Sequence, residues 1–308
     1  MAKKKGGLLS MPRSIVSKIT RPKIDTIGEK SGVKKMTKSA SSKHTRTIIR
    51  ALHTLMKNKA LMEAEIQALS NSLATIESNI ALNGGLDVYQ KASILGQDVR
   101  RGGDSSKILV EWLKELNCKS KSLSMLEVGC LSSKNFCSRC NLFNKIERID
   151  LNSQEPLVKQ QDFMKRPYPT GKEEEFDIIS LSLVVNFVPI PADRGLMLYK
   201  TVKFLSKENL SDDTKCTPCL FFVLPLPCVS NSRYCNEERI TQIMNSLGYS
   251  LLKRKQATKL IYWLWKYDRK PDMTTIKDKT ITSTFKKDQL NPGGNRNNFH
   301  IILENKLE

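Results

Sequence analysis

A glycine and an aspartate, each at the end of a predicted strand, are the residues of this chain best suited to bind a small molecule. A strand predicted over 123–128 is followed at once by Gly129, and 21 residues later a strand predicted over 146–151 reaches Asp150. In a doubly wound parallel sheet the carboxyl ends of neighbouring strands meet at one edge, where ligands bind. Glycine lets the backbone approach a ligand closely, and a carboxylate at the next strand end can accept both hydroxyls of a ribose.

A second aspartate extends this pattern to a third strand. Asp162, followed by Phe163, comes 12 residues after Asp150, where a third parallel strand would end. A carboxylate beside an aromatic ring is suited to the amino group and the ring of adenine. These positions therefore predict a cofactor that contains adenosine. The alternative interpretation is a glycine that only ends a strand, accompanied by two solvent-exposed aspartates.

The loop after the first strand distinguishes between adenosine cofactors. It reads GCLSSK over 129–134, with one glycine where a dinucleotide would require the pattern G-x-G-x-x-G around its pyrophosphate. S-adenosylmethionine has no phosphate and needs no such cradle. We therefore expect S-adenosylmethionine in preference to a dinucleotide.

The run SLSLVVNFVP over 180–189 supplies the residues that could face a substrate. A strand is predicted over 176–185, so Asn186 and Phe187 fall in its exit loop. The amide of Asn186 could orient a nucleobase and Phe187 could stack on it; the alternative is a polar cap next to a core phenylalanine. Methyl transfer from a sulfonium depends mainly on positioning, and a ring nitrogen such as adenine N1 already carries a lone pair. No metal and no strong general base are therefore expected.

The elements that position these residues alternate between strand and helix. Helical periodicity runs from Thr45 to Ala81, where two or more helices fit, and a further helix follows Asp104 as its N-cap. Later segments predict a strand over 220–224, a helix over 237–247, and two closing antiparallel strands over 259–266 and 299–303. The tryptophans Trp263 and Trp265 are interpreted as core residues. The predicted fold is α/β, a Rossmann-like class I methyltransferase sheet with an N-terminal helical extension.

Three regions are expected from composition and pattern. They are a basic disordered arm over 1–43, a helical region over 44–103, and a Rossmann-like domain over 104–308 that contains a polar insertion loop at 268–298. Of the formal net charge of +20, residues 1–46 contribute 13 Lys and Arg against two acids, a net of 13 − 2 = +11. Charge concentrated in this way favours contact with nucleic-acid phosphates. A nuclear-import or solubilising tail is the alternative.

The cysteines and the hydropathy pattern indicate the cellular setting. The chain has eight cysteines, no apolar leader after its N-terminus and no apolar run long enough to cross a membrane. We therefore expect an intracellular protein with reduced thiols and no membrane span. The pairs Cys137/Cys140 and Cys216/Cys219 lie 76 residues apart, which favours ordinary thiols over a shared zinc site.

Several of these motifs together resemble one known family. LDVYQKAS over 86–93 with the following Gly96-Gln97, LEVG over 126–129, IDL over 149–151, QDF over 161–163 and FDIIS over 176–180 are similar to the fungal nucleolar adenine-N1 methyltransferases of large-subunit (25S) ribosomal RNA. The resemblance runs from about Ile48 to Trp265. It implies that Gly129 and Asp150 bind S-adenosylmethionine, that Asp162 borders its adenine, and that the cofactor also lies near three polar residues ahead of the sheet, Gln90, Ser93 and Gln97.

The resemblance leaves two functions open. An animal relative in the same family resembles a sensor of S-adenosylmethionine that acts through a protein partner, so the shared motifs indicate cofactor binding more directly than catalysis. The basic arm favours the enzyme, because a sensor has no evident need of it. We expect a monomeric nucleolar methyltransferase acting on ribosomal RNA or a pre-ribosome. The loop over 165–169 is a candidate for a further RNA contact, and the insertion over 268–298 is either another such surface or only a disordered loop.

Overall fold

The computed structural model describes residues 42–85, 88, 103–118, 123–207, 217–268 and 284–304. The chain divides into two compact units, residues 1–82 and 83–308, and each is described by itself. The predicted cofactor residues Gln90, Ser93 and Gln97 lie outside the described residues. So do residues 1–41 of the basic arm and residues 269–283 of the insertion loop.

The described part of the first unit is a single helix, α1 (Ser42–Leu82). The sequence predicts two or more helices here, but no glycine or proline occurs between residues 42 and 82, so nothing interrupts the helical hydrogen bonding. Every α1 side chain from residue 50 onward is exposed. None of the described helices combines the length and the apolar composition needed to cross a lipid bilayer.

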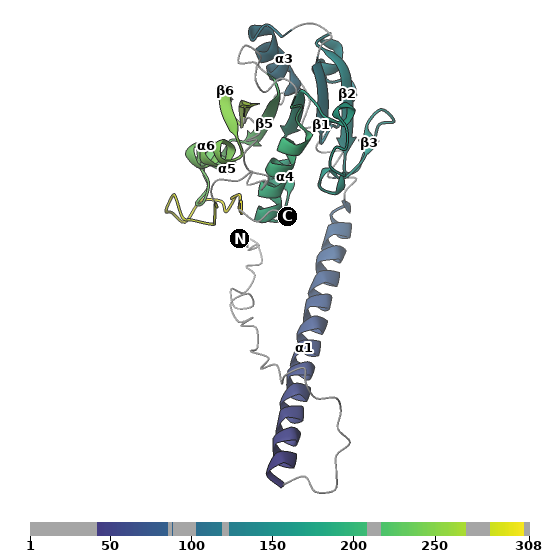
Figure 1. Cartoon of the computed structure of the whole chain (residues 1–308), viewed down its shortest axis with the longest axis vertical. Coiled ribbons are helices and arrows are strands. Elements are labelled where there is room, and N and C mark those ends of the chain that lie inside the picture. Colours follow the sequence, from purple (N-terminus) through teal and green to yellow (C-terminus); the bar gives the residue numbers. More distant parts are fainter. Residues whose placement is uncertain are drawn as a thin grey trace, which may run out of the picture. The chain divides into compact units, whose positions relative to one another are not determined.

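The second unit is built on a seven-stranded sheet with the order β3-β2-β1-β4-β5-β7-β6 (Figure 1). Its strands β1 to β5 are parallel, and β7 is antiparallel to both β5 and β6. This topology confirms the Rossmann-like class I methyltransferase sheet. The strands are β1 (Leu123–Val128), β2 (Phe143–Asp150), β3 (Lys159–Gln160), β4 (Ile178–Ser182), β5 (Cys219–Pro225), β6 (Tyr249–Gln256) and β7 (Leu260–Tyr267).

Helices cover both faces of this sheet. Side chains of α4 (Pro191–Phe204) and α6 (Glu237–Ser246) pack with Leu126, Ile179 and Phe222 on one face. Helix α3 (Ser106–Glu115) packs with the alternate residues Met125, Ile178 and Phe221 on the other. Burial on both faces explains why the strands read as continuous apolar runs. Trp263 and Trp265 are core residues, as predicted, with exposed fractions of 2% and 0%.

The closing strands differ from the prediction. The sequence does not predict β6, because the second half of this strand is charged and largely exposed, as befits the last strand at one edge of the sheet. The predicted strand over 299–303 is wrong. Its Ile301 and Leu303 are buried against the core, but in this run only Leu303 forms a bridge, an isolated one with Phe285. The apolar run therefore reflects burial without strand pairing.

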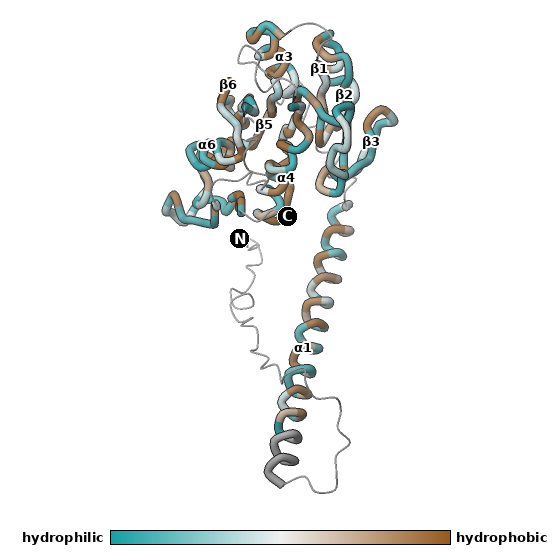
Figure 2. Tube along the Cα trace, viewed as in Figure 1, coloured by the Kyte–Doolittle hydropathy of each residue, from teal (hydrophilic) through white to brown (hydrophobic). Residues whose placement is uncertain are grey.

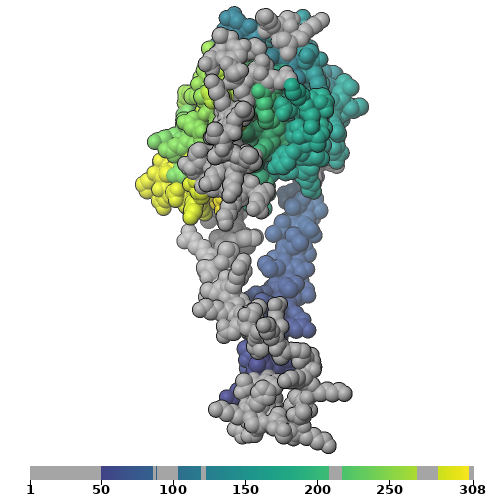
Figure 3. Space-filling model, in the orientation of Figure 1, coloured from purple at the N-terminus to yellow at the C-terminus, as the bar shows by residue number. Residues whose placement is uncertain are grey.

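Within the second unit, the C-terminal segment over 284–304 packs near α5 (Pro227–Ser230) and α6. Figure 3 shows this segment in yellow beside the light-green chain of that region. Ser232 Oγ donates to the carbonyl oxygen of Phe299 at 2.5 Å, and Arg233 Nε donates to that of Gly293 at 3.0 Å. The described residues of this unit also form short 3-10 helices: η3 (Phe136–Arg139), η4 (Phe163–Lys165), η5 (Lys172–Glu174) and η6 (Val185–Phe187).

Candidate cofactor site

The strand ends that the sequence singles out meet at one edge of the sheet. Val128 of β1 lies beside Ile149 of β2 and Leu181 of β4, so Gly129 comes next to both Asp150 and the exit of β4. The edge between β1 and β4 is where the strand order reverses, which is the usual ligand position in open parallel sheets.

Gly129 has a conformation that favours glycine. Its φ is +72°, and its N–H donates to the carbonyl oxygen of Ile149 at 2.9 Å. A Cβ at this position would lie 2.6 Å from Cγ2 of Val184 in the loop that leaves β4. A side chain here would be strained by the backbone and would crowd the next loop, so glycine keeps the backbone open toward the edge of the sheet.

The two aspartates end adjacent strands. Asp150 closes β2, and one of its carboxylate oxygens, Oδ1, accepts from the N–H of Asn152 at 2.8 Å. Its carbonyl oxygen accepts from the N–H of Gln161 at 2.8 Å, which places Asp162 one residue further along. Asp162 in turn caps η4 by accepting from the N–H of Met164 at 2.8 Å. Both carboxyls are partly exposed, so a ligand can reach the edge that they share with Gly129.

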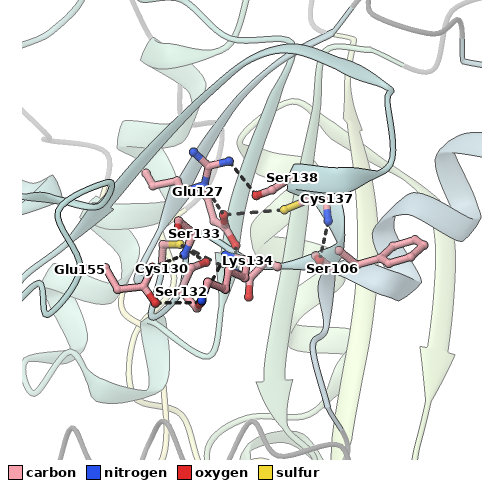
Figure 4. A network of polar contacts seen from close by, with 12 residues as sticks. Ser106, Glu127, Cys130, Ser132, Ser133, Lys134, Cys137, Ser138 and Glu155 are labelled. Carbon is pink, nitrogen blue, oxygen red and sulfur yellow. Dashed lines mark hydrogen bonds and ion pairs between the residues drawn. The ribbon is translucent and has the colours of Figure 1, made fainter.

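Two glutamates that the sequence analysis missed hold the loop after Gly129 (Figure 4). Glu127 is buried within β1 and accepts from Nδ2 of Asn135 at 2.7 Å. Glu155 accepts from Ser132 Oγ at 2.9 Å and from the N–H of Ser133 at 2.7 Å. Two carboxylates therefore hold this loop, one at its middle and one at its far end, where a phosphate loop would have a glycine-rich backbone. No local sequence pattern marks these pairings.

Burial favours the neutral forms of the groups beneath this loop. It raises the pKa of Glu127, and it raises the pKa of the Cys137 thiol to about 12. Burial likewise raises the pKa of Cys130. A protonated, buried thiol is a poor nucleophile and a poor metal ligand. In the described residues, no three His, Cys, Asp or Glu side chains are grouped so that they could hold a metal ion.

The segment before α3 also reaches this edge. The N-cap of α3 is Ser105, one residue after the predicted Asp104, but Asp104 still binds the start of the helix because its Oδ1 accepts from the N–H of Ser106 at 2.8 Å. Its other oxygen accepts from the N–H of Phe136 in the loop after Gly129. Ser105 Oγ lies 2.8 Å from Ser182 Oγ at the end of β4. The start of α3 therefore connects the loop after β1 with the exit of β4.

The exit of β4 contains the residues predicted to place a substrate. Leu183 has a φ of +59°, an uncommon conformation for a residue with a side chain, and strain of this kind is concentrated at functional sites. Asn186 follows in η6, and its buried side-chain oxygen Oδ1 has no hydrogen-bond partner among the described residues. Phe187 is 58% exposed. The structure thus places a buried acceptor and an exposed aromatic side by side in this loop.

Arg194 of α4 holds this exit loop through hydrogen bonds to its backbone. Its guanidinium donates to the carbonyl oxygens of Val188 at 2.7 Å and His300 at 2.7 Å, and it lies over the ring of Phe299 at 4.7 Å. The C-terminal segment and the β4 exit are therefore tied together. Sequence reasoning missed Arg194 because its partners are distant in the chain.

The loop after Asp162 is held in a similar way. Lys200 of α4 is buried and donates to the carbonyl oxygens of Met164 at 3.0 Å and Arg166 at 2.5 Å. The sequence analysis named the loop over 165–169 as a candidate RNA contact. Arg166, however, forms a two-pronged ion pair with Glu147, at 2.5 and 3.1 Å, and only 11% of its side chain is exposed. Its charge is already neutralised within the protein.

Comparisons with known proteins identify the family. Residues 74–301 match the sequence profile of the family described as 25S rRNA (adenine(2142)-N(1))-methyltransferase, Bmt2. The chain is 38% identical over 254 residues to the 25S rRNA (adenine(2142)-N(1))-methyltransferase of Saccharomyces cerevisiae, covering 82% of this chain and 70% of that protein. It is 39% identical over 260 residues to the 25S rRNA adenine-N(1) methyltransferase of Schizosaccharomyces pombe, covering 82% and 89%.

The chain belongs to this methyltransferase family. Membership confirms the family resemblance seen in the sequence. It favours an enzyme over a sensor, since both relatives are named as methyltransferases. It also agrees with S-adenosylmethionine, the methyl donor expected from the single-glycine loop, as the cofactor of this site.

Two solved structures of methyltransferases are similar to the chain at much lower identity. The N-methyltransferase NodS of Bradyrhizobium japonicum is 13% identical with a TM-score of 0.37, covering 53% of this chain and 97% of that one. The amino pentose methyltransferase CalS10 of Micromonospora echinaspora is 12% identical with a TM-score of 0.38, covering 57% and 96%.

Proposed function

We propose that this protein transfers the methyl group of S-adenosylmethionine to N1 of an adenine in large-subunit ribosomal RNA. The proposal is carried by the family match, because residues 74–301 include every described residue of the site. The geometry at the sheet edge supports it independently of the match, since it offers groups suited to both the donor and the base.

The donor would be held by the three strand ends. The carboxylate of Asp150 accepts hydrogen bonds from the ribose hydroxyls, and that of Asp162 accepts from the adenine amino group. The open backbone at Gly129 leaves room for the methionine part. S-adenosylmethionine supplies a methyl group already activated on a positively charged sulfur, so these residues need to position the donor without activating it.

The acceptor adenine would be held at the exit of β4. Asn186 Oδ1, buried and without a described partner, can accept a hydrogen bond from the exocyclic amino group beside N1. Guanine carries an acceptor oxygen at that position, so the same contact would be repulsive. Phe187, exposed next to it, can stack on the base. The N1 lone pair then forms the new N–C bond as the S–C bond breaks, and no proton has to be removed.

Ribosomal RNA in a pre-ribosomal particle is the substrate we propose, with the nucleolus as the site of action. The net charge of +11 on residues 1–46 supports this, because clustered lysines and arginines bind RNA phosphates without reading sequence. A small-molecule methyltransferase would gain nothing from such a segment.

The test is a methyl-transfer assay with the purified full chain. Large-subunit ribosomal RNA lacking the modification is incubated with labelled S-adenosylmethionine, and the modified nucleoside is identified by mass spectrometry. N1-methyladenosine is the expected product. Asn186→Ala should lower turnover about tenfold to a hundredfold, the value of one buried hydrogen bond, without changing the affinity for S-adenosylmethionine. A chain that binds S-adenosylmethionine but methylates neither RNA nor pre-ribosomes would overturn the proposal.

A further inference from the structure

Helix α1 carries an apolar seam with the repeat of a coiled coil. Its members follow one another at alternating steps of three and four residues, and all but Lys59 are apolar: Leu52, Leu55, Lys59, Met62, Ile66, Leu69, Leu73, Ile76 and Ile80. Figure 2 shows the apolar residues recurring as brown bands along the helix. An average step of 3.5 residues, kept over more than four heptads, is the signature of helices that wind around each other.

The seam is exposed along its whole length. Each apolar member has an exposed fraction between 43% and 67%. A stripe with a 3.5-residue repeat stays on one face only when its helix supercoils about a partner helix, since a straight helix repeats every 3.6 residues. Met56 lies beside the seam and Leu61 lies outside it. The pattern therefore favours another helix as the binding partner of this seam over a flat protein surface.

The described part of the chain offers no other helix with a free matching face. The apolar residues of α3, α4 and α6 are buried against the sheet, as Trp112, Leu198 and Ile243 illustrate. A second copy of α1 is the partner that carries the same repeat and the same length.

The charges of α1 indicate how two copies would lie. Residues 50–59 contain Arg50, Lys57 and Lys59 and no acid, whereas residues 60–82 contain Glu63, Glu65 and Glu77 and no base. Two parallel copies would bring like charges together and place Lys59 against Lys59 of the second copy in the seam. Two antiparallel copies bring the basic half of one helix beside the acidic half of the other.

We propose that α1 forms an antiparallel coiled coil with α1 of a second copy, which makes the protein a homodimer. Layers of an antiparallel coiled coil pair first-position with fourth-position residues of the heptad. Three registers give the same number of apolar layers, and of these the one centred between Ile66 and Leu69 brings Lys59 nearest to an acid of the second copy. Lys59 then packs on Ile76 of the second copy, with Glu77 of that copy beside it. The proposed dimer differs from the monomer that we expect from the sequence.

The first experiment is sedimentation velocity on the full chain with charged seam variants. The wild-type chain should sediment as a dimer. The double variant Ile66→Lys with Leu73→Lys should raise the dimer dissociation constant at least about a hundredfold, because both copies carry the changes and apolar packing is weakened in four layers of the dimer. The matched control, Gln67→Lys with Ala74→Lys, adds the same charge outside the seam and should stay dimeric.

Measuring S-adenosylmethionine binding by the seam variants distinguishes loss of dimerisation from misfolding and from failure of the proposed function. The described site residues all belong to the other unit, so the seam variants should bind the cofactor as the wild type does. A monomeric wild-type chain at tens of micromolar, or a seam variant that remains dimeric, would overturn the proposal. Neither result bears on whether the protein methylates RNA.

A charge exchange tests the orientation. Lys59→Glu should weaken the dimer, because it sets two glutamates side by side and also removes the ion pair between Lys59 and Glu63, 3.6 Å apart in the same helix. Glu77→Lys should weaken it as well. Only in the antiparallel register does the double variant restore opposite charges, so it should dimerise more tightly than either single variant. A double variant no tighter than the singles would refute the antiparallel pairing.

Discussion

Replacement of Asp150 by alanine is the most direct perturbation of the candidate cofactor site. The side chain ends β2 next to Gly129, and one of its oxygens already accepts from the N–H of Asn152. In the proposed site the carboxylate also accepts two hydrogen bonds from the ribose. Hydrogen bonds to a charged acceptor contribute about 1.5–3 kcal/mol each.

The expected loss of binding free energy for S-adenosylmethionine is smaller than the sum of two such hydrogen bonds, because the carboxyl is partly exposed and solvent screens its charge. We take about 2–4 kcal/mol, which corresponds to a dissociation constant for S-adenosylmethionine raised roughly 30-fold to 1000-fold. Isothermal titration calorimetry measures this directly. Asp150→Asn keeps one acceptor without the charge, so its affinity should fall between those of the wild type and the alanine variant.

Asp177→Ala is the matched control. Asp177 precedes β4 at the opposite end of the sheet, where it accepts from the N–H and the Oγ of Ser124, both at 2.8 Å. Its loss should lower the free energy of unfolding and leave the cofactor affinity unchanged. If Asp150→Ala bound S-adenosylmethionine as tightly as the wild type, the assignment of this sheet edge as the cofactor site would be wrong.

Three further predictions concern other parts of the chain. Deleting residues 1–41 removes 11 lysines and arginines, so filter binding should show weaker affinity for RNA and a salt slope flatter by about 0.9 for each phosphate that the arm no longer neutralises; an unchanged slope would leave the arm without a role in binding. Gly195→Ala should lower stability by about 1–3 kcal/mol in urea unfolding, because its Cβ would lie 1.9 Å from the carbonyl oxygen of Ile302. Wild-type stability would contradict this packing. Burial raises the pKa of Glu127 above its usual 4.5, so the native state holds the proton more tightly than the unfolded chain. The stability contributed by this group is therefore present below 4.5 and lost as pH rises through the folded pKa; Glu127→Gln should flatten that decline, and an equal slope in both proteins would argue against it.

The sequence by itself determined the framework of the site. A continuous apolar run marked β5, because a strand covered on both faces has apolar side chains on both, and a shorter, mostly apolar run marked β1. The polar residues that follow such runs marked the strand ends, which is why Gly129, Asp150 and Asp162 could be placed at one edge from the sequence. These are local patterns, and each depends on a few consecutive residues.

Only the tertiary structure decided how the loops around that edge are held. Arg194 reaches His300 across 106 residues of sequence, and Glu155 reaches Ser133 across 22. The tertiary structure also showed that the run over 299–303 covers the core without joining the sheet. It showed further that Glu147 neutralises the charge of Arg166. Such contacts depend on which segments the fold brings together, and an isolated stretch of sequence carries no periodic signal for a partner that lies far along the chain.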